Sequence, residues 1–142
     1  MTHERPTAQD YPLAERRPEL VRGAGGNALD DISIATLSSG DVCMENLRIT
    51  PDALRQQASI ARDAGRAELA DNFERAAEMA TIPQDVIMSY YELLRPGRAK
   101  GKDQLLAAAA QLRNDYNAPL IAAFVEEAAD VYDRRGLFRF RY

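Results

Sequence analysis

The stretch from Asn117 to Arg135, NAPLIAAFVEEAADVYDRR, carries the clearest structural signal in this sequence. Its apolar residues recur every three or four positions, which predicts an amphipathic α-helix with one buried stripe. We expect the stripe to consist of Leu120, Ile121, Phe124, Val125, Ala128 and Tyr132. Phe124 lies in its middle, with space beside it for a large ring. Gly136 follows directly and predicts the end of the helix.

Four further helices are predicted upstream of this one. Thr50-Pro51-Asp52 is a strong start signal, because Thr caps free N–H groups, Pro fits the first helical position and Asp complements the helix dipole. Small residues then share one face of that helix up to Gly65, where we expect it to break. The other helices are expected over about 66–80, 82–95 and 103–116. Their predicted inward residues include Leu69, Phe73, Val86, Ile87, Tyr90, Leu94, Leu105, Leu106 and Leu112.

The sequence therefore predicts a mainly α fold, a compact bundle of about five helices with an extended N-terminal arm. Residues 1–31 are rich in Pro, Gly and charge and are expected to form that arm, which docks on a partner. Residues 32–136 form the helical domain, and residues 137–142 an arginine-aromatic tail. One short strand pair is also expected, because Leu47 and Ile49 alternate with polar neighbours.

Composition excludes several kinds of chemistry. The chain has 142 residues, a net charge of −4, one histidine and one cysteine. His3 and Cys43 alone make neither a disulfide nor a zinc site of the usual ligand types. The Gly23–Asn27 loop lacks the strand and the Lys-Ser/Thr pair of a phosphate-binding loop. We therefore expect no catalytic, cofactor-binding or metal-ligating residue in this chain.

The same composition bears on location and partners. An acidic chain is not expected to bind nucleic acid, since such binding needs a basic surface. No apolar run is long enough to cross a membrane, and the N-terminus has no secretory signal, so we expect a cytoplasmic protein without membrane contact.

Two groups of residues are candidates for contact with a partner protein. Tyr11, Pro12 and Leu13 form an apolar island in an arm too polar to build its own core, which predicts an anchor on a partner. Tyr91 follows Tyr90, so both cannot lie at the centre of one stripe. Tyr90 is expected in the core, and Tyr91 either packs at its rim or contacts a partner.

The tail Leu137–Tyr142 leaves three interpretations open. If extended, it places Phe138, Phe140 and Tyr142 on one side and two arginines on the other. It could dock on a partner, fold back on its own helices, or touch nucleic acid or membrane. Phe138 and Phe140 are therefore added to the candidate interface.

Several motifs, taken in order, resemble one known family. They are DYPLA at 10–14, LRITP at 47–51, QASIA at 57–61, NFERAAE at 72–78, Ile82-Pro83, YELLRP at 91–96 and AAFVEEA at 122–128. The chain resembles the small (gamma) subunit of adenosylcobalamin-dependent diol and glycerol dehydratases. The resemblance covers about residues 10–135, nearly the whole chain.

The resemblance implies a noncatalytic role in a larger enzyme, a dimer of large–medium–small heterotrimers. That enzyme converts 1,2-propanediol to propionaldehyde, or glycerol to 3-hydroxypropionaldehyde, with loss of water. The resemblance further implies that adenosylcobalamin is bound by the large (alpha) and medium (beta) subunits, with none bound by this chain, and that the small subunit packs on the large one.

Two departures from the family pattern leave open the preferred substrate and the role of the tail. Only Met1 to Gln9 precede the DYPLA motif, so we expect the long arm associated with packaging into bacterial microcompartments to be essentially absent, and location in a microcompartment stays open. This length resembles the glycerol type, while residues 54–61 are closer to the diol type. The arginine-aromatic tail after Gly136 does not match the polar, lysine-containing tails associated with the family. The alternative function is a free-standing helical adaptor that binds a protein partner.

Overall fold

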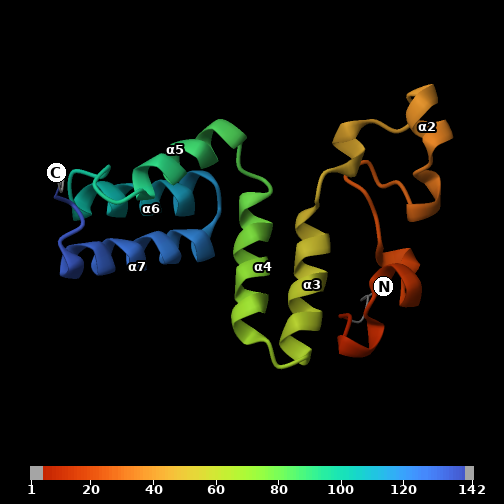
Figure 1. Ribbon diagram of the computed structural model, residues 1–142, viewed down its shortest axis with the longest axis horizontal. Coiled ribbons are helices and arrows are strands. Elements are labelled where there is room, and N and C mark those ends of the chain that lie inside the picture. The colour runs from red at the N-terminus through yellow and green to blue at the C-terminus, as the bar shows by residue number, and fades with distance from the viewer. Residues whose placement is uncertain (1–4, 140–142) are drawn as a thin grey trace. The chain divides into compact units, whose positions relative to one another are not determined.

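A computed structural model describes residues 5–139 of the chain (Figure 1), and no β-strand occurs among them. The mainly α fold expected from the sequence is confirmed. The chain divides into two compact units, residues 1–80 and 81–142, and each is described by itself.

The first unit ends in a pair of long helices. It contains α1 (Leu13–Arg16), α2 (Ile34–Ser39), α3 (Pro51–Asp63) and α4 (Ala67–Met79), with short 3₁₀ helices η1 (Ala8–Asp10), η2 (Pro18–Leu20), η3 (Leu29–Asp31) and η4 (Met44–Leu47). The helices α3 and α4 pack side by side as a hairpin (Figure 1). Thr50 caps α3, since its Oγ1 accepts a hydrogen bond of 3.1 Å from the Ala53 N–H. Gly65 adopts φ +75° in the turn between them, as the predicted break requires.

Small side chains form the contact between α3 and α4. Ala58, Ala61 and Ala70 are buried there, with the half-buried Phe73 packed against them. Methyl groups let the two helix backbones approach closely, but they bury little apolar surface. The core of the α3–α4 hairpin therefore buries little apolar surface.

The N-terminal arm is attached to α3 of its own chain. The Ser59 hydroxyl donates to the Pro6 carbonyl over 2.7 Å, and the Ala8 N–H donates to Asp63 Oδ2 over 2.9 Å. Leu13 keeps only 6% of its surface exposed. Side chains of α3 thus bind backbone groups of the arm, while the docking of this arm on a partner stays a prediction.

The glycine-rich loop is held by Asn46 of η4. The Ala24 N–H donates to the Asn46 carbonyl over 3.0 Å, and Asn46 Nδ2 donates to Asn27 Oδ1 over 3.1 Å. A Cβ added at Gly23 would lie 2.4 Å from the Asn46 carbonyl oxygen. The loop therefore needs glycine for the close approach of two backbones.

Gly23→Ser is expected to lower the free energy of unfolding by about 1–3 kcal/mol, because the new side chain forces the loop away from Asn46. Gly101→Ser is the matched control, since a Cβ there meets nothing within 4 Å and the position caps α6. Serine at that cap changes stability by only a few tenths of a kcal/mol. Urea unfolding followed by circular dichroism measures both variants, and equal effects would contradict the close approach.

The second unit consists of three helices, α5 (Gln84–Leu94), α6 (Lys102–Asp115) and α7 (Pro119–Arg135). Its core contains Leu105, Leu112 and Val125, which are fully buried, together with several alanines of α6 and α7. Two exposed ion pairs also join α6 to α7, Arg113 with Glu126 at 2.7 Å and Lys102 with Asp130 at 2.7 Å. Gly136 ends α7 with φ +63°, as predicted.

The buried face of α7 differs from the predicted one. Its buried residues are Ala122, Val125 and Ala129, whereas Phe124 is 44% exposed and Leu120 45% exposed. The prediction that Phe124 is a core residue is therefore wrong. Because α7 packs closely on α6, the side of α7 with small side chains is buried. The larger apolar side chains of α7 lie at the edge of this contact and stay partly exposed. For a related reason Leu69 and Leu106 are partly exposed.

The described part of the tail folds back on the second unit. The ring of Phe138 lies edge-on to Tyr132, with 6.0 Å between ring centroids, and packs against the core. The Gly97 N–H also donates to the Leu137 carbonyl over 3.0 Å. Of the three interpretations of the tail, folding back holds for Phe138, while Phe140 and Tyr142 lie outside the described residues.

The predicted strand at Leu47 and Ile49 is wrong. Leu47 closes η4, and the one β-bridge in the described chain is isolated and joins Arg22 to Ala28. Residues of η4 use their polar groups to hold the glycine-rich loop, so no partner strand forms.

Candidate functional site

Among residues 5–139, no group of three or more His, Cys, Asp or Glu side chains could hold a metal ion. The one histidine, His3, lies outside these residues. No helix in this part of the chain has both the length and the apolar character needed to cross a membrane. Two surface features of the first unit are described next.

The first feature is a run of exposed apolar side chains, here called the 29–49 segment. Six large apolar residues in it are at least two-fifths exposed, while Val42 is its buried apolar residue. The six are Leu29, Ile34, Leu37, Met44, Leu47 and Ile49. Ile34 reaches 85% exposure at the start of α2, and Figure 1 shows α2 away from the α3–α4 hairpin. So much exposed apolar surface in a short run is typical of an interaction site.

The charges of the 29–49 segment are almost all negative. Asp30, Asp31, Asp41 and Glu45 lie in it, and no Lys or Arg occurs between Arg22 and Arg48. Hydrogen bonds from its own backbone N–H and from the Cys43 thiol hold the pKa of Glu45 below its ordinary value. The segment therefore presents apolar side chains among ionised carboxylates.

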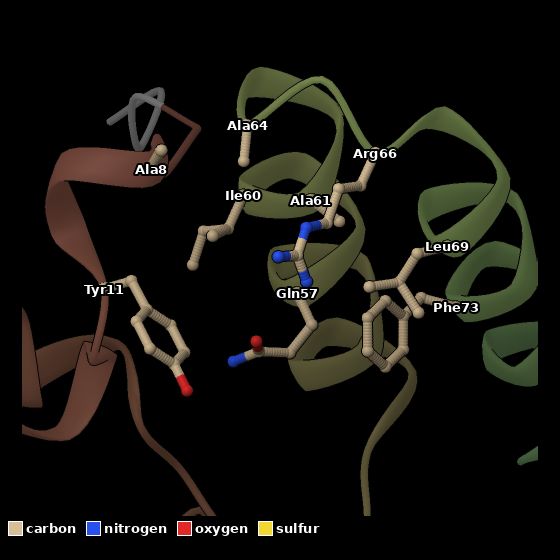
Figure 2. Close-up of a pocket in the computed structure, with 9 residues that line it drawn as sticks. All are labelled: Ala8, Tyr11, Gln57, Ile60, Ala61, Ala64, Arg66, Leu69 and Phe73. Carbon is tan, nitrogen blue, oxygen red and sulfur yellow. The ribbon is translucent and has the colours of Figure 1, made fainter.

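The second feature is a groove between the N-terminal arm and the α3–α4 hairpin, here called the Arg66 groove (Figure 2). It has a volume of about 470 Å³. Ala8 and Tyr11 form one wall. The rest is lined by residues of α3, α4 and the turn between them: Gln57, Ile60, Ala61, Ala64, Arg66, Leu69 and Phe73. The hydrogen bond from Ala8 to Asp63 sets the position of the arm relative to α3.

Two arginines near this groove differ in their partners. Arg62 binds Asp71 at 3.2 Å and Glu74 at 2.7 Å, and these contacts raise its pKa, the hydrogen bond to Glu74 most of all. Arg66 begins α4, and Figure 2 shows its guanidinium over the groove near Gln57. No ion pair to Arg66 is present among residues 5–139. The groove thus has mostly apolar walls, with the amide of Gln57 inside it and one cationic group at its edge.

The structure brings only one of the predicted interface residues into such a feature. Tyr11 is 61% exposed and lines the Arg66 groove, with Pro12 half-buried beside it. Leu13 is buried within its own unit and has little surface left for a partner.

The remaining predicted interface residues belong to the second unit. Tyr91 on α5 is 60% exposed, so it keeps a surface that a partner could cover. Phe138 packs on its own core, and Phe140 lies outside the described residues. A partner contact of Tyr91 stays a prediction.

Sequence reasoning missed the 29–49 segment and Arg66. The sequence did hold a sign that the segment is exposed. Its apolar residues are isolated and follow no helical or strand period over any useful length, so no buried face is predicted for them. The sequence held no such sign for Arg66, because only the folded hairpin shows that Arg62 has acidic partners and Arg66 has none among the described residues.

The small buried core of the first unit and its exposed apolar segment are typical of a helical protein with an interaction surface. The model of the dehydratase small subunit family matches residues 6–139, so the chain belongs to that family.

Two relatives are similar over most of this chain. The chain is 51% identical to the propanediol dehydratase small subunit of Salmonella typhimurium over 126 residues, 89% of this chain and 72% of the relative. It is 50% identical to the propanediol dehydratase small subunit of Citrobacter freundii, covering 89% of this chain and 73% of that relative. The family resemblance stated from the sequence motifs is confirmed.

Proposed function

We propose that this chain is the noncatalytic small subunit of an adenosylcobalamin-dependent dehydratase that acts on 1,2-propanediol or glycerol. In this proposal it packs on the large subunit, within a dimer of large–medium–small heterotrimers in the cytoplasm. Family membership and the names of the two relatives support the dehydratase. The 29–49 segment is the observation that carries the docking role, because it exposes large apolar side chains that a subunit interface would bury.

The cofactor is proposed to bind to the partner subunits. Adenosylcobalamin supplies the radical that starts the reaction, and the protein around it supplies enclosure and orientation. We propose no site for that cofactor on this chain, because its described residues include no histidine and the Arg66 groove, at about 470 Å³, has the volume of a site for a drug-sized ligand. No reaction step is therefore assigned to this chain.

The test is reconstitution from defined chains. The large and medium dehydratase subunits of the same organism are co-expressed with the tagged small chain and purified on the tag. We expect both larger subunits to elute with it and the complex to form aldehyde from 1,2-propanediol when adenosylcobalamin is added. We expect the small chain alone to form no aldehyde and to leave the cobalamin spectrum unchanged.

A small chain that purifies without the larger subunits, while these assemble and react without it, would favour the free-standing adaptor instead. Comparing rates on propanediol and glycerol in the same preparation decides the preferred substrate, which the resemblance leaves open.

A further inference from the structure

The Arg66 groove has the shape of a shallow protein-binding site. Its floor is apolar and partly buried, since Ile60 and Ala61 are 7% and 6% exposed. Its rim is accessible, with Tyr11 at 61% and Leu69 at 39% exposure. Tyr11 lines one side of the groove and Leu69 and Phe73 the other, and Figure 2 shows the side chains of Gln57 and Arg66 between them.

The groove also carries a charge that its own walls do not neutralise. Asp63 on α3 accepts the Ala8 N–H, and Asp10 on η1 accepts the Thr7 N–H and lies 3.5 Å from Arg17. Hydrogen bonds from Thr7 hold the pKa of Asp10 below its ordinary value, so this carboxylate is ionised and already engaged. Asp71 and Glu74 are taken by Arg62. In the described chain, Arg66 is left without an acidic partner at the mouth of an apolar groove.

We infer that the Arg66 groove binds a segment of a partner subunit in which a large apolar side chain lies beside a carboxylate. The inference rests on the proposed function and specifies one contact of the subunit interface. The apolar side chain enters the groove lined by Tyr11 and Phe73, and the carboxylate pairs with the guanidinium of Arg66. Tyr and Arg are the residue types most enriched among interface residues with large binding contributions, and Arg binds carboxylates through two parallel hydrogen bonds.

A polypeptide fits this groove better than a small molecule. The polar groups near it are few, and its open rim would leave much of a small ligand in water, whereas small-molecule sites bury most of their ligand. A protein segment covers the rim as well as the floor and desolvates the ion pair at the edge, where it then contributes most to specificity.

The experiment measures binding of small-chain variants to the purified large–medium complex by titration calorimetry. Arg66→Glu places a negative charge against the incoming carboxylate, and we expect it to weaken binding by about tenfold or more, as for the loss of a close interfacial charge pair. Arg66→Lys keeps the charge without the paired geometry, and a smaller loss is expected. Arg55→Glu makes the same charge change on α3 outside the groove, and it should alter affinity less than about threefold.

Salt dependence separates an ion pair from a structural effect of Arg66. The wild-type affinity should fall as NaCl rises from 0.05 to 0.5 M, because salt screens the pair, and this fall should be smaller for Arg66→Met. Circular dichroism of each free variant shows whether it folds like the wild type, and Arg66→Lys, which keeps the charge, serves as the folded reference.

The outcomes distinguish this inference from the proposed function. If Arg66→Glu binds the large–medium complex as tightly as the wild type, the groove is not part of the interface and the inference is overturned, although the proposed function stands. The inference is also overturned if the groove proves to bind a second copy, seen as a dimer of the free chain that Arg66→Glu abolishes. If the wild-type chain does not bind the complex at all, the proposed function itself fails.

Discussion

Leu112→Ala is expected to lower the free energy of unfolding of this chain by about 2–5 kcal/mol, the range for removing a fully buried leucine. Leu112 is 1% exposed and lies in the core of the second unit, between α6 and α7. The loss combines the apolar surface returned to water with the cavity left in a core that cannot collapse around it. Because a domain has only about 5–15 kcal/mol of stability, the variant should be marginal.

Phe124→Ala is the matched control on the facing helix. It removes a larger side chain, yet Phe124 is 44% exposed in the wild type. The substitution therefore loses only about half of the free energy that full burial of such a side chain gives, and it leaves no closed cavity. We expect a cost of about 1–1.5 kcal/mol, roughly half the transfer free energy of a large apolar side chain.

Urea unfolding, with hydrogen exchange of the α6 and α7 amides, measures both variants. A larger cost for Phe124→Ala than for Leu112→Ala would mean that α7 turns its larger side chains inward, as the sequence pattern alone had suggested.

The positions of the helices were predictable because local residues set them. The helix predicted to start at Thr50-Pro51 begins at Pro51, and the helix predicted over 117–135 runs from Pro119 to Arg135. Capping side chains, prolines and glycines act within one turn of the chain, so their effect can be read without knowing the tertiary structure.

The orientation of a helix was harder to predict, because α7 has apolar residues on two adjacent faces. A hydrophobic stripe favours the larger residues, but helices that approach closely bury small ones, here Ala122 and Ala129. Which face of α7 is buried depends on the surface of α6 that it packs against, and a single sequence does not show that surface.

Contacts between distant residues were not predictable either. Pro6 and Ser59 are 53 residues apart, yet their hydrogen bond holds the arm on α3. The same applies to Asn46, which reaches the loop at Gly23–Asn27. Sequence motifs identified the family, whereas the exposed 29–49 segment and the Arg66 groove needed the fold.

Ile34→Asp is expected to weaken binding of this chain to the large–medium dehydratase complex by about thirtyfold, the equivalent of roughly 2 kcal/mol at an interface hot spot. Ile34 is 85% exposed in the free chain, so the substitution removes no core contact. It also lies at the first position of α2, where a negative charge is favourable to the helix. The free variant should therefore fold as well as the wild type, and any loss of binding belongs to the interface.

Ala35→Asp provides the control, since it adds the same charge to the next residue of α2 and removes no large apolar side chain. We expect it to weaken binding much less than Ile34→Asp. If both substitutions weaken binding equally, the effect is electrostatic: the partner surface repels negative charge and the apolar side chain contributes little. If neither does, the 29–49 segment lies outside the interface, and the exposed apolar residues that carry the docking proposal would need another partner to cover them. A loss confined to Ile34→Asp is the result that a buried apolar contact requires, because the added charge is then the same in both variants and only the apolar side chain differs.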